Sequence, residues 1–412
     1  MTPAYARVVG LSRFLKLGEC VTFTAGEHRQ LAEVVQIDEH GATVKTFDTS
    51  VLACLGERVY RSDALRILPH QGWKGRVINA LGLPIDAAGP LELGARAFEV
   101  DASPPPAMRR SRVQNPLKTG VRVIDLFTPL CAGQRIGIFA GSGVGKSTLL
   151  AMLAGSRDFD AVVIALVGER GREVREFLDD ALAANRSIAV AVVATSDESP
   201  AIRRLAPRTA LTIAEYFRDQ GESVLLIVDS ITRFAHAARE VALAAGEPAV
   251  ARGYAPSIFS DIPKLLERAG PGEEGKGSIT GIFSVLVDGD DHNDPIADTI
   301  RSTLDGHIVL EREIAEQGRF PPVNVLRSIS RLAHLAWTSE QSVAISKLRR
   351  LVARYEDTRD LRLMGGYREG NDPELDNAIT LVPRIYAAIA QSPQSGPSEN
   401  AFRELTEFLQ SK

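Results

Sequence analysis

The sequence contains few of the residues that build disulfide frameworks or metal centres. Three of its 412 residues are cysteines, Cys20, Cys54 and Cys131, and they are widely separated along the chain. An odd number of cysteines without metal-type spacing argues against a disulfide scaffold and against a zinc site. The sequence therefore predicts buried free thiols in a reducing compartment.

Long hydrophobic runs are also missing. No segment approaches the roughly 20 apolar residues of a membrane helix, and the N-terminus lacks the apolar core of a signal peptide. This predicts a cytoplasmic protein that associates with membranes only through partners. The formal net charge of -4 provides no overall basic field, so we expect no nucleic-acid binding. The length of 412 residues suggests two or three domains.

The chain does contain a glycine-rich loop in the setting that phosphate binding requires. The loop lies between the apolar runs 135–139 and 149–153, an order typical of strand, loop and helix. Its N–H groups and the helix N-terminus can bind phosphates, Lys146 can reach the outer phosphates, and the Ser147 hydroxyl can ligate Mg²⁺. Ala140 replaces the first glycine of the usual pattern, and its small side chain should fit. The alternative is an ordinary glycine turn. We predict an ATP site with Mg²⁺ formed by Gly141, Ser142, Gly143, Val144, Gly145, Lys146, Ser147 and Thr148.

Two further apolar runs end in carboxylates, as expected of parallel strands buried on both faces. The run 224–228 ends at Asp229, which can hold Mg²⁺ through water beside the loop. The run 161–168 ends at Glu169, which can orient a water molecule for attack on a phosphate. The alternative for Glu169 is a solvated helix start, which is the interpretation that we prefer for Glu173.

The pattern of apolar residues divides the chain into three parts. Short β-rich pieces separated by turn residues indicate a small antiparallel barrel at the N-terminus. Strands and helices then alternate, which predicts a mostly parallel sheet with crossover helices. Helical periodicity dominates beyond Ala336. We predict an α/β protein with domains 1–70, 71–336 and 337–412. The strands expected in the barrel are 20–23, 31–37, 43–47 and 66–68, and the C-terminal helices expected are 340–363, 374–391 and 400–410.

Ordered sequence blocks between about Gly75 and Ala388 resemble the flagellar and type III secretion export ATPases of the rotary ATPase group, and the flagellar branch fits better. The resemblance implies an N-terminal barrel, a RecA-like P-loop ATPase core and a C-terminal helical domain. It also implies a homohexameric ring at the cytoplasmic face of the inner membrane. The blocks are 139–147, 168–174, 229–234, 244–248, 289–291, 294–298, 305–310 and 328–331.

The resemblance assigns three further residues. Arg331 matches an arginine finger that reaches the nucleotide of a neighbouring subunit, where a planar guanidinium stabilises the transferring phosphoryl group. Arg170 matches a second arginine near the phosphates, and Phe320 matches an aromatic residue that stacks on adenine. Without the family, Arg331 would be interpreted as a surface or salt-bridge residue and Phe320 as a core residue.

The implied activity is ATP hydrolysis that energises or primes protein export and releases chaperone and substrate at the export gate. One chain carrying Lys146, Glu169 and Arg331 can supply both halves of a site shared between identical subunits. The implied partners are other copies of the chain, export-gate proteins, a stator-like regulator, export chaperones and their substrates. Family members commonly bind the regulator through an N-terminal helical extension, for which the start of the barrel near Tyr5 leaves little room.

Three other functions compete with this interpretation. A catalytic subunit of a rotary ATP synthase shares the core, but the family-specific blocks and the short helical C-terminal region argue against it. A non-hydrolysing ring subunit would typically lack Glu169. An RNA-translocating ring helicase also shares the core, but the predicted barrel lacks a clear basic and aromatic pattern.

Overall fold

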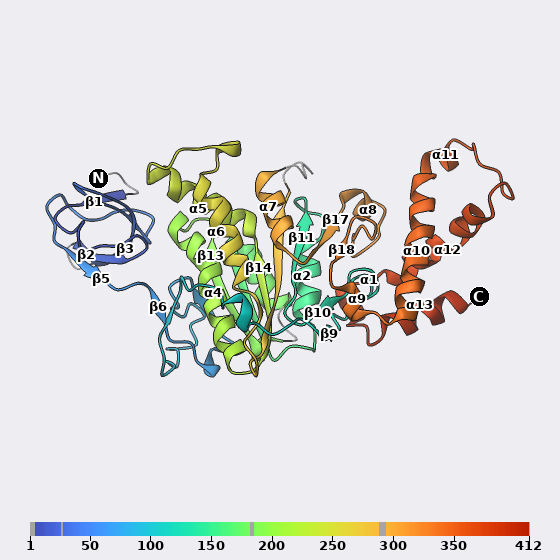
Figure 1. Ribbon diagram of the computed structural model, residues 1–412, viewed down its shortest axis with the longest axis horizontal. Coiled ribbons are helices and arrows are strands. Elements are labelled where there is room, and N and C mark those ends of the chain that lie inside the picture. Colours follow the sequence, from blue (N-terminus) through green and yellow to red (C-terminus); the bar gives the residue numbers. More distant parts are fainter. Residues whose placement is uncertain (1–4, 26–27, 182–184, 288–293, 412) are drawn as a thin grey trace.

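The computed structural model describes residues 5–25, 28–181, 185–287 and 294–411, which form three regions along its long axis (Figure 1). A small antiparallel barrel lies at one end, a mostly parallel sheet with flanking helices in the centre, and a group of helices at the other end. The predicted α/β class, with its barrel and helical region, is confirmed. The sequence block 289–291 falls outside the described residues.

The barrel is a five-stranded sheet in the order β1-β4-β3-β2-β5. Its interior is filled by apolar side chains such as Val21, Phe23, Val34 and Val44, which are almost completely buried. The expected strand at 66–68 is wrong as a barrel strand, because β6 (Arg66–Ile67) pairs with β8 (Phe98–Glu99) instead. The barrel strands are β1 (Tyr5–Val8), β2 (Cys20–Ala25), β3 (His28–Asp38), β4 (Gly41–Thr46) and β5 (Val59–Ser62).

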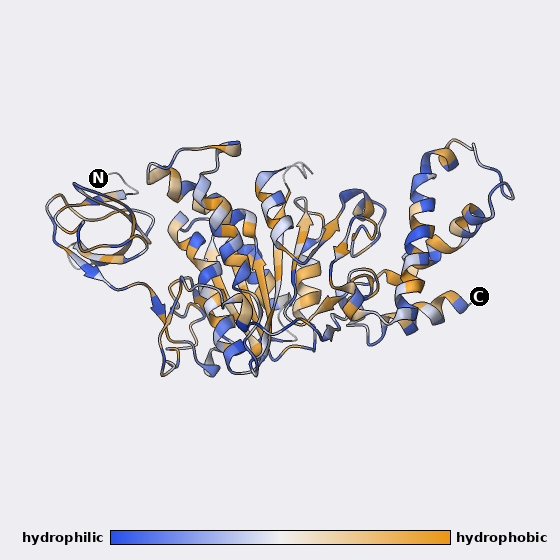
Figure 2. Ribbon diagram, in the orientation of Figure 1, coloured by the Kyte–Doolittle hydropathy of each residue, from blue (hydrophilic) through white to orange (hydrophobic). Residues whose placement is uncertain are grey.

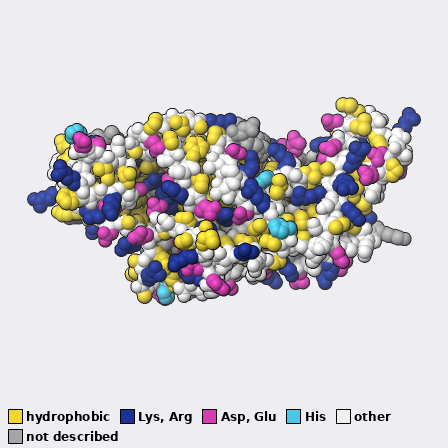
Figure 3. Space-filling model, viewed as in Figure 1, with side chains coloured by type: hydrophobic (Ala, Val, Ile, Leu, Met, Phe, Trp, Pro, Cys, Tyr) yellow, Lys and Arg dark blue, Asp and Glu magenta, His cyan; other side chains and the backbone are white. Residues whose placement is uncertain are grey.

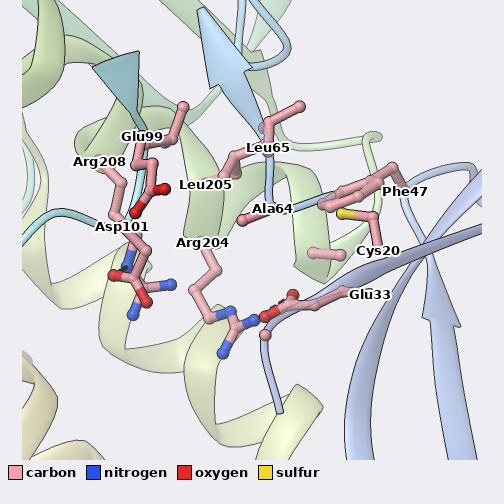
Figure 4. Close-up of a pocket in the computed structure, with 13 residues that line it drawn as sticks. Cys20, Glu33, Phe47, Ala64, Leu65, Glu99, Asp101, Arg204, Leu205 and Arg208 are labelled. Atoms are coloured by element: carbon pink, nitrogen blue, oxygen red, sulfur yellow. Dashed lines mark hydrogen bonds and ion pairs between the residues drawn. The ribbon is translucent and has the colours of Figure 1, made fainter. Parts of the chain in front are cut away.

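The barrel contacts the core through helix α4 (Pro200–Asp219) and the residue before it. Figure 4 shows the Arg204 guanidinium facing the Glu33 carboxylate of the barrel, with which it forms an ion pair. Ser199 donates a hydrogen bond to the Phe47 carbonyl at 2.6 Å. Cys20 lines the small cavity at this junction, which measures about 70 Å³.

The cysteine prediction is confirmed for two of the three residues. Cys20 and Cys131 are buried and carry free thiols, whereas Cys54 is exposed. Cys54 lies in the connection between β4 and β5, outside the alternating pattern that places strand side chains in the barrel interior.

The central sheet has the order β18-β17-β11-β16-β14-β12-β13-β7, with β15 paired to β16. From β17 to β7 the strands are parallel, and every residue of β12 is buried because packing covers both faces of the sheet. Figure 2 shows these strands as the most hydrophobic part of the centre. The strands are β7 (Val77–Asn79), β11 (Arg135–Ala140), β12 (Ala161–Glu169), β13 (Ala189–Thr195), β14 (Ser223–Asp229), β15 (Gly270–Pro271), β16 (Ser278–Leu286), β17 (Gly306–Leu310) and β18 (Ile329–Ser330).

Helices connect these strands, and several begin at a residue that the sequence marks as a cap. Ser199, Ser230 and Asp294 each accept a hydrogen bond from a backbone N–H group in the first turn of α4, α5 and α7. The helices other than α4 are α1 (Arg122–Phe127), α2 (Lys146–Ala154), α3 (Gly171–Glu176), α5 (Ile231–Ala244), α6 (Pro256–Glu267), α7 (Pro295–Thr303) and α8 (Arg312–Glu316).

The C-terminal region is helical, as predicted, and α10 packs against α12 through buried residues such as Val352, Val382 and Ile385. The expected helix at 340–363 is divided at Thr358 into α10 and α11. Within the described ranges, every helix is too short or too polar to cross a bilayer. The helices are α9 (Ala333–Ala336), α10 (Ser339–Asp357), α11 (Arg359–Leu363), α12 (Pro373–Ile389) and α13 (Ala401–Gln410).

Candidate nucleotide site

The glycine-rich loop lies between the end of β11 and the start of α2, as the sequence predicts. Gly143 and Gly145 have φ angles of 76° and 105°, a left-handed region that glycine adopts without steric cost. Ala140 is the last residue of β11 and pairs with Leu286 and Leu310, so its side chain belongs to the sheet rather than to the turn. This explains why alanine is tolerated where the pattern has glycine.

The carboxyl ends of the strands bring three predicted residues together. Lys146 forms an ion pair with Asp229, and its Nζ atom lies 3.8 Å from Oε1 of Glu169. All three residues are buried, although they belong to α2, β14 and β12. Buried charges require partners, because burial without one costs several kcal/mol. Lys146 therefore compensates the charge of both carboxylates in this structure.

A cavity of about 340 Å³ opens beside Lys146 and Glu169. All residues of the loop from Gly141 to Thr148 except Val144 line it, together with Glu169 and Arg170. Val144 is instead buried in the core, so its predicted contribution to the cavity is limited to the backbone. Arg170 is mostly exposed and lies 3.7 Å from Glu173.

A second cavity of about 680 Å³ continues from the loop toward the C-terminal region. It is lined by Ser147, Thr148 and Asp229 on one side and by Pro393 and Gln394 on the other. The Ser147 side chain is solvent-exposed, whereas the Asp229 carboxylate is held by Lys146 and by the Ser284 hydroxyl, which donates at 2.5 Å. A hydroxyl and a carboxylate are suitable oxygen ligands for Mg²⁺.

Phe320 lies beside the same loop. Its carbonyl accepts a hydrogen bond from the Gln391 N–H at 2.9 Å, and Pro322 packs within 3.8 Å of the position of a Cβ atom on Gly145. Phe320 is 48% exposed, so it is not a core residue. An exposed aromatic ring next to a phosphate-binding loop can stack on a base.

Arg331 does not line either cavity, and neither does Phe320. The Arg331 N–H donates to the carbonyl of Asp305, whose own N–H donates to Arg135 at the start of β11. The loop follows the other end of β11, five residues away, which corresponds to about 16 Å. Arg331 is exposed, and it lies at the opposite end of the sheet from the loop of its own chain.

Sequence reasoning missed three residues that hold the site. Arg233 forms an ion pair with Glu169, Ser284 donates to Asp229, and Arg312 donates to the Ser142 carbonyl at 2.9 Å. Arg233 lies four residues after Asp229 in a block that the sequence analysis noted without assigning it a role. No local sequence pattern marks Ser284 or Arg312 as a site residue. Parallel strand pairing brings Ser284 to the site, and Arg312 reaches it from the start of α8, just after β17.

Comparisons with known proteins agree with this geometry. Residues 120–330 match the family model described as ATP synthase alpha/beta family, nucleotide-binding domain, and residues 337–407 match the T3SS EscN ATPase C-terminal domain. The chain is 57% identical over 402 residues to a flagellum-specific ATP synthase of Agrobacterium fabrum, which covers 98% of this chain and 85% of the relative.

Two solved structures of the type III secretion ATPase EscN from enteropathogenic E. coli are also similar. The assembled EscN superposes with a TM-score of 0.92 at 42% identity, covering 99% of this chain and 98% of EscN. EscN in complex with its central stalk EscO superposes with a TM-score of 0.89 at 41% identity, with the same coverage.

Proposed function

The chain belongs to the ATP synthase alpha/beta family, in its flagellar and type III secretion branch, and on this premise we propose that it hydrolyses ATP in a homohexameric ring whose sites are shared between neighbours. The family makes the chain a nucleotide-binding ATPase. We propose which residues carry out hydrolysis, that the chain forms a ring, and that the ring has export partners.

The proposal of a shared site rests on one observation, the separation of Arg331 from the other catalytic residues of its own chain. Lys146, Glu169 and Asp229 converge on the cavity at the carboxyl end of the sheet, whereas Arg331 lies about 16 Å away at the amino end. An exposed Arg331 cannot serve the nucleotide of its own chain from there. If each subunit presents its cavity to the Arg331 face of the next, identical heterologous contacts close a ring.

The chemistry follows from the groups around the cavity. Main-chain N–H groups of the loop and the Lys146 ammonium bind the phosphates, and the Lys146–Asp229 ion pair opens as the phosphates compete for the cation. Glu169 orients water for in-line attack, with Arg233 holding its carboxylate as a positioning residue. Arg170 from the same chain and Arg331 from the neighbour then stabilise the charge on the transferring phosphoryl group.

Magnesium fits the oxygen ligands of the cavity. Across the described residues, no group of three or more histidine, cysteine or acidic side chains forms a metal cage. Mg²⁺ typically uses one or two protein ligands together with water and substrate phosphates, which matches a site of Ser147 and water-linked Asp229. Mg²⁺ would neutralise charge on the phosphates when bound.

We assign the base to the space between the loop and the C-terminal region. Phe320 would stack on adenine, and Pro393 and Gln394 would line the wall of the larger cavity. Because Gln391 is hydrogen-bonded to Phe320, a movement of the C-terminal helices would be transmitted to the base.

The biological role that we propose is protein export. The higher identity to a flagellum-specific relative than to EscN favours flagellar over virulence export. The ring would act at the cytoplasmic face of the inner membrane with export-gate proteins, a stator-like regulator, a central stalk, chaperones and their substrates. Those partners would provide the membrane attachment.

The test of the shared site is a mixing experiment. Arg331→Ala and Lys146→Ala chains should each lack ATP turnover, and mixed rings should regain part of it, because some interfaces then pair an intact cavity with an intact Arg331. Arg327→Ala, which removes an exposed arginine four residues earlier, is the control and should retain turnover. Mixed rings that assemble but stay inactive would contradict a finger that acts between subunits.

A further inference from the structure

A second cleft, outside the nucleotide site, lies between the loop after α8 and the C-terminal helices. It measures about 520 Å³ and is lined by Arg319, Arg359, Arg362 and Glu356, together with apolar residues such as Leu363 and Pro383. Three guanidinium groups and one carboxylate give this cleft a net positive charge in a chain whose formal net charge is -4. We call it the arginine cleft.

Two of the arginines are held in place by a pair of tyrosines. The Arg319 guanidinium lies 3.9 Å from the centre of the Tyr386 ring, and the Arg362 guanidinium lies 3.7 Å from that of Tyr355. The two rings meet edge to face at 6.4 Å, and the Tyr386 hydroxyl donates to Glu356 at 2.5 Å. The two arginines therefore lie at the two ends of a stack with the two tyrosine rings between them. These cation–π contacts fix both guanidinium groups without neutralising their charge.

The arginines of the cleft have donors to spare. Arg319 donates through Nε to Gln317 at 3.1 Å and Arg362 through Nη2 to the Tyr355 carbonyl at 2.7 Å, but within the described part of the chain none of Arg319, Arg359 and Arg362 forms a salt bridge. By contrast, Arg354 on the neighbouring turn pairs with Asp372. Guanidinium groups without a carboxylate partner in a partly enclosed site are suited to binding carboxylates or phosphates from outside the chain.

The surroundings favour carboxylates on a peptide over a nucleotide. One face of each tyrosine ring is already covered by an arginine, which reduces the surface on which a base could stack. The rim is apolar, since Leu363 is 76% exposed and Met364 is 85% exposed. On the face shown in Figure 3, Lys and Arg side chains gather over the C-terminal helical region.

We propose that the arginine cleft binds an acidic, leucine-rich segment of a partner protein. Carboxylates of the segment would pair with Arg359 and Arg362, and its apolar side chains would pack on the Leu363 rim. Arg319 directly precedes Phe320 in the chain, so an occupied cleft would also restrict the backbone that carries the proposed base-stacking ring.

The test uses the full chain and a fluorescein-labelled peptide of alternating Glu and Leu as the probe, followed by fluorescence anisotropy. The same peptide with Gln in place of Glu is the charge control. Binding of the acidic probe should be saturable and should weaken with added salt, and the Gln peptide should bind at least about tenfold more weakly.

Substitutions then locate the probe. The Arg359→Glu/Arg362→Glu double variant should bind it at least about tenfold more weakly, whereas Arg350→Glu, which reverses an exposed arginine of α10 outside the cleft, should bind it nearly as well as the parent. Matching thermal unfolding curves would show that the variants remain folded.

Several results would overturn the proposal. The first three are the absence of saturable binding, equal binding of the Gln peptide, and equal binding by the double variant. The fourth is displacement of the probe by inorganic phosphate or tripolyphosphate at concentrations below that of the peptide. Such displacement would indicate a site for free anions. The Lys146→Ala chain should bind the probe normally, so failure of the nucleotide site and failure of this proposal can be told apart.

Discussion

Two buried ion pairs on the central sheet and its helices have almost the same solvent exposure but different surroundings. The Lys146 and Asp229 side chains are 9% and 3% exposed, and those of Arg268 and Glu215 are 3% and 9% exposed. Arg268 donates to both oxygens of Glu215 at 2.9 and 2.8 Å, and also to the Val100 carbonyl and the Thr212 hydroxyl. Lys146 has one close carboxylate and faces a cavity.

The difference shows that burial alone does not separate a structural ion pair from a functional one. The Arg268 guanidinium makes four hydrogen bonds, all to acceptors that belong to the fold, so it offers little to a ligand. The Lys146 ammonium keeps donors available on the side of the cavity, and an incoming phosphate can replace Asp229. The number of satisfied donors and the presence of adjacent space therefore distinguish the two roles.

The strongest test of this comparison is Lys146→Ala. We expect nucleotide binding or turnover to fall by at least about 10³-fold, because the cation that competes for the phosphates is lost. Thermal stability should fall less than it does in Arg268→Ala, since Asp229 keeps the hydrogen bond from Ser284. Fluorescent ATP-analogue binding and a thermal melt measure the two effects. A large loss of stability with normal nucleotide binding would reverse the assignment.

Glu169→Gln separates binding from hydrolysis at the same cavity. The amide should still allow ATP to bind, but turnover should fall by about 10²- to 10³-fold because the water is no longer oriented by a carboxylate. Glu173→Gln is the matched control, since Glu173 lines the cavity rim and should leave turnover nearly unchanged. Phosphate release under saturating ATP gives the answer, and full activity of Glu169→Gln would refute its role.

Arg268→Ala tests the other member of the comparison. Removing this guanidinium leaves Glu215 buried without its cation, which should cost about 3–5 kcal/mol of stability. The molecules that remain folded should keep their affinity for nucleotide. A urea titration and a binding isotherm on the same sample report both quantities, and an unchanged urea midpoint would show that the pair contributes little.

The positions of the site residues in the chain explain which of them could be predicted from the sequence. Three parts of the site lie directly after apolar runs, and strand and loop patterns therefore predict them. They are the loop from Gly141 to Thr148, the residue Glu169 and the residue Asp229. The parallel sheet brings them together. The α/β class and the helical C-terminal region follow from the same periodicity. Ser284 lies inside a buried strand and Arg312 after another, so their contacts depend on which strands are neighbours.

Other features depend on tertiary structure in the same way. The two-residue strand at Arg66 is too short to carry a periodic signal, which is why its pairing with Phe98–Glu99 was not predicted. The position of Arg331 relative to the loop of its own chain could be known only from the order of the strands. The pairing of β18 with β17 places Arg331 at the amino end of the parallel strands. Its assignment as a finger came from resemblance and stays a prediction.

A partly buried carboxylate, Asp125, extends the comparison to a charge that is stabilised by hydrogen bonds rather than by a cation. It accepts hydrogen bonds from the Thr119 N–H and hydroxyl and from the Gly120 N–H. Burial nevertheless raises the pKa of this carboxyl group to about 6. The native chain therefore binds more protons than the unfolded chain between about pH 4 and pH 6, so this group makes stability fall as pH rises through that window.

The Asp125→Asn variant cannot titrate at this position. It should lose a roughly constant 1 kcal/mol, because its amide nitrogen faces the Gly120 N–H. The stability of the parent relative to this variant should therefore fall by up to about 3 kcal/mol between pH 4 and pH 7, so that the variant becomes the more stable chain near pH 7. Urea midpoints of both chains across that range measure the difference. A difference that stays constant with pH would mean that the three donors compensate for the missing cation. Hydrogen bonds alone would then hold this partly buried carboxylate in its charged form.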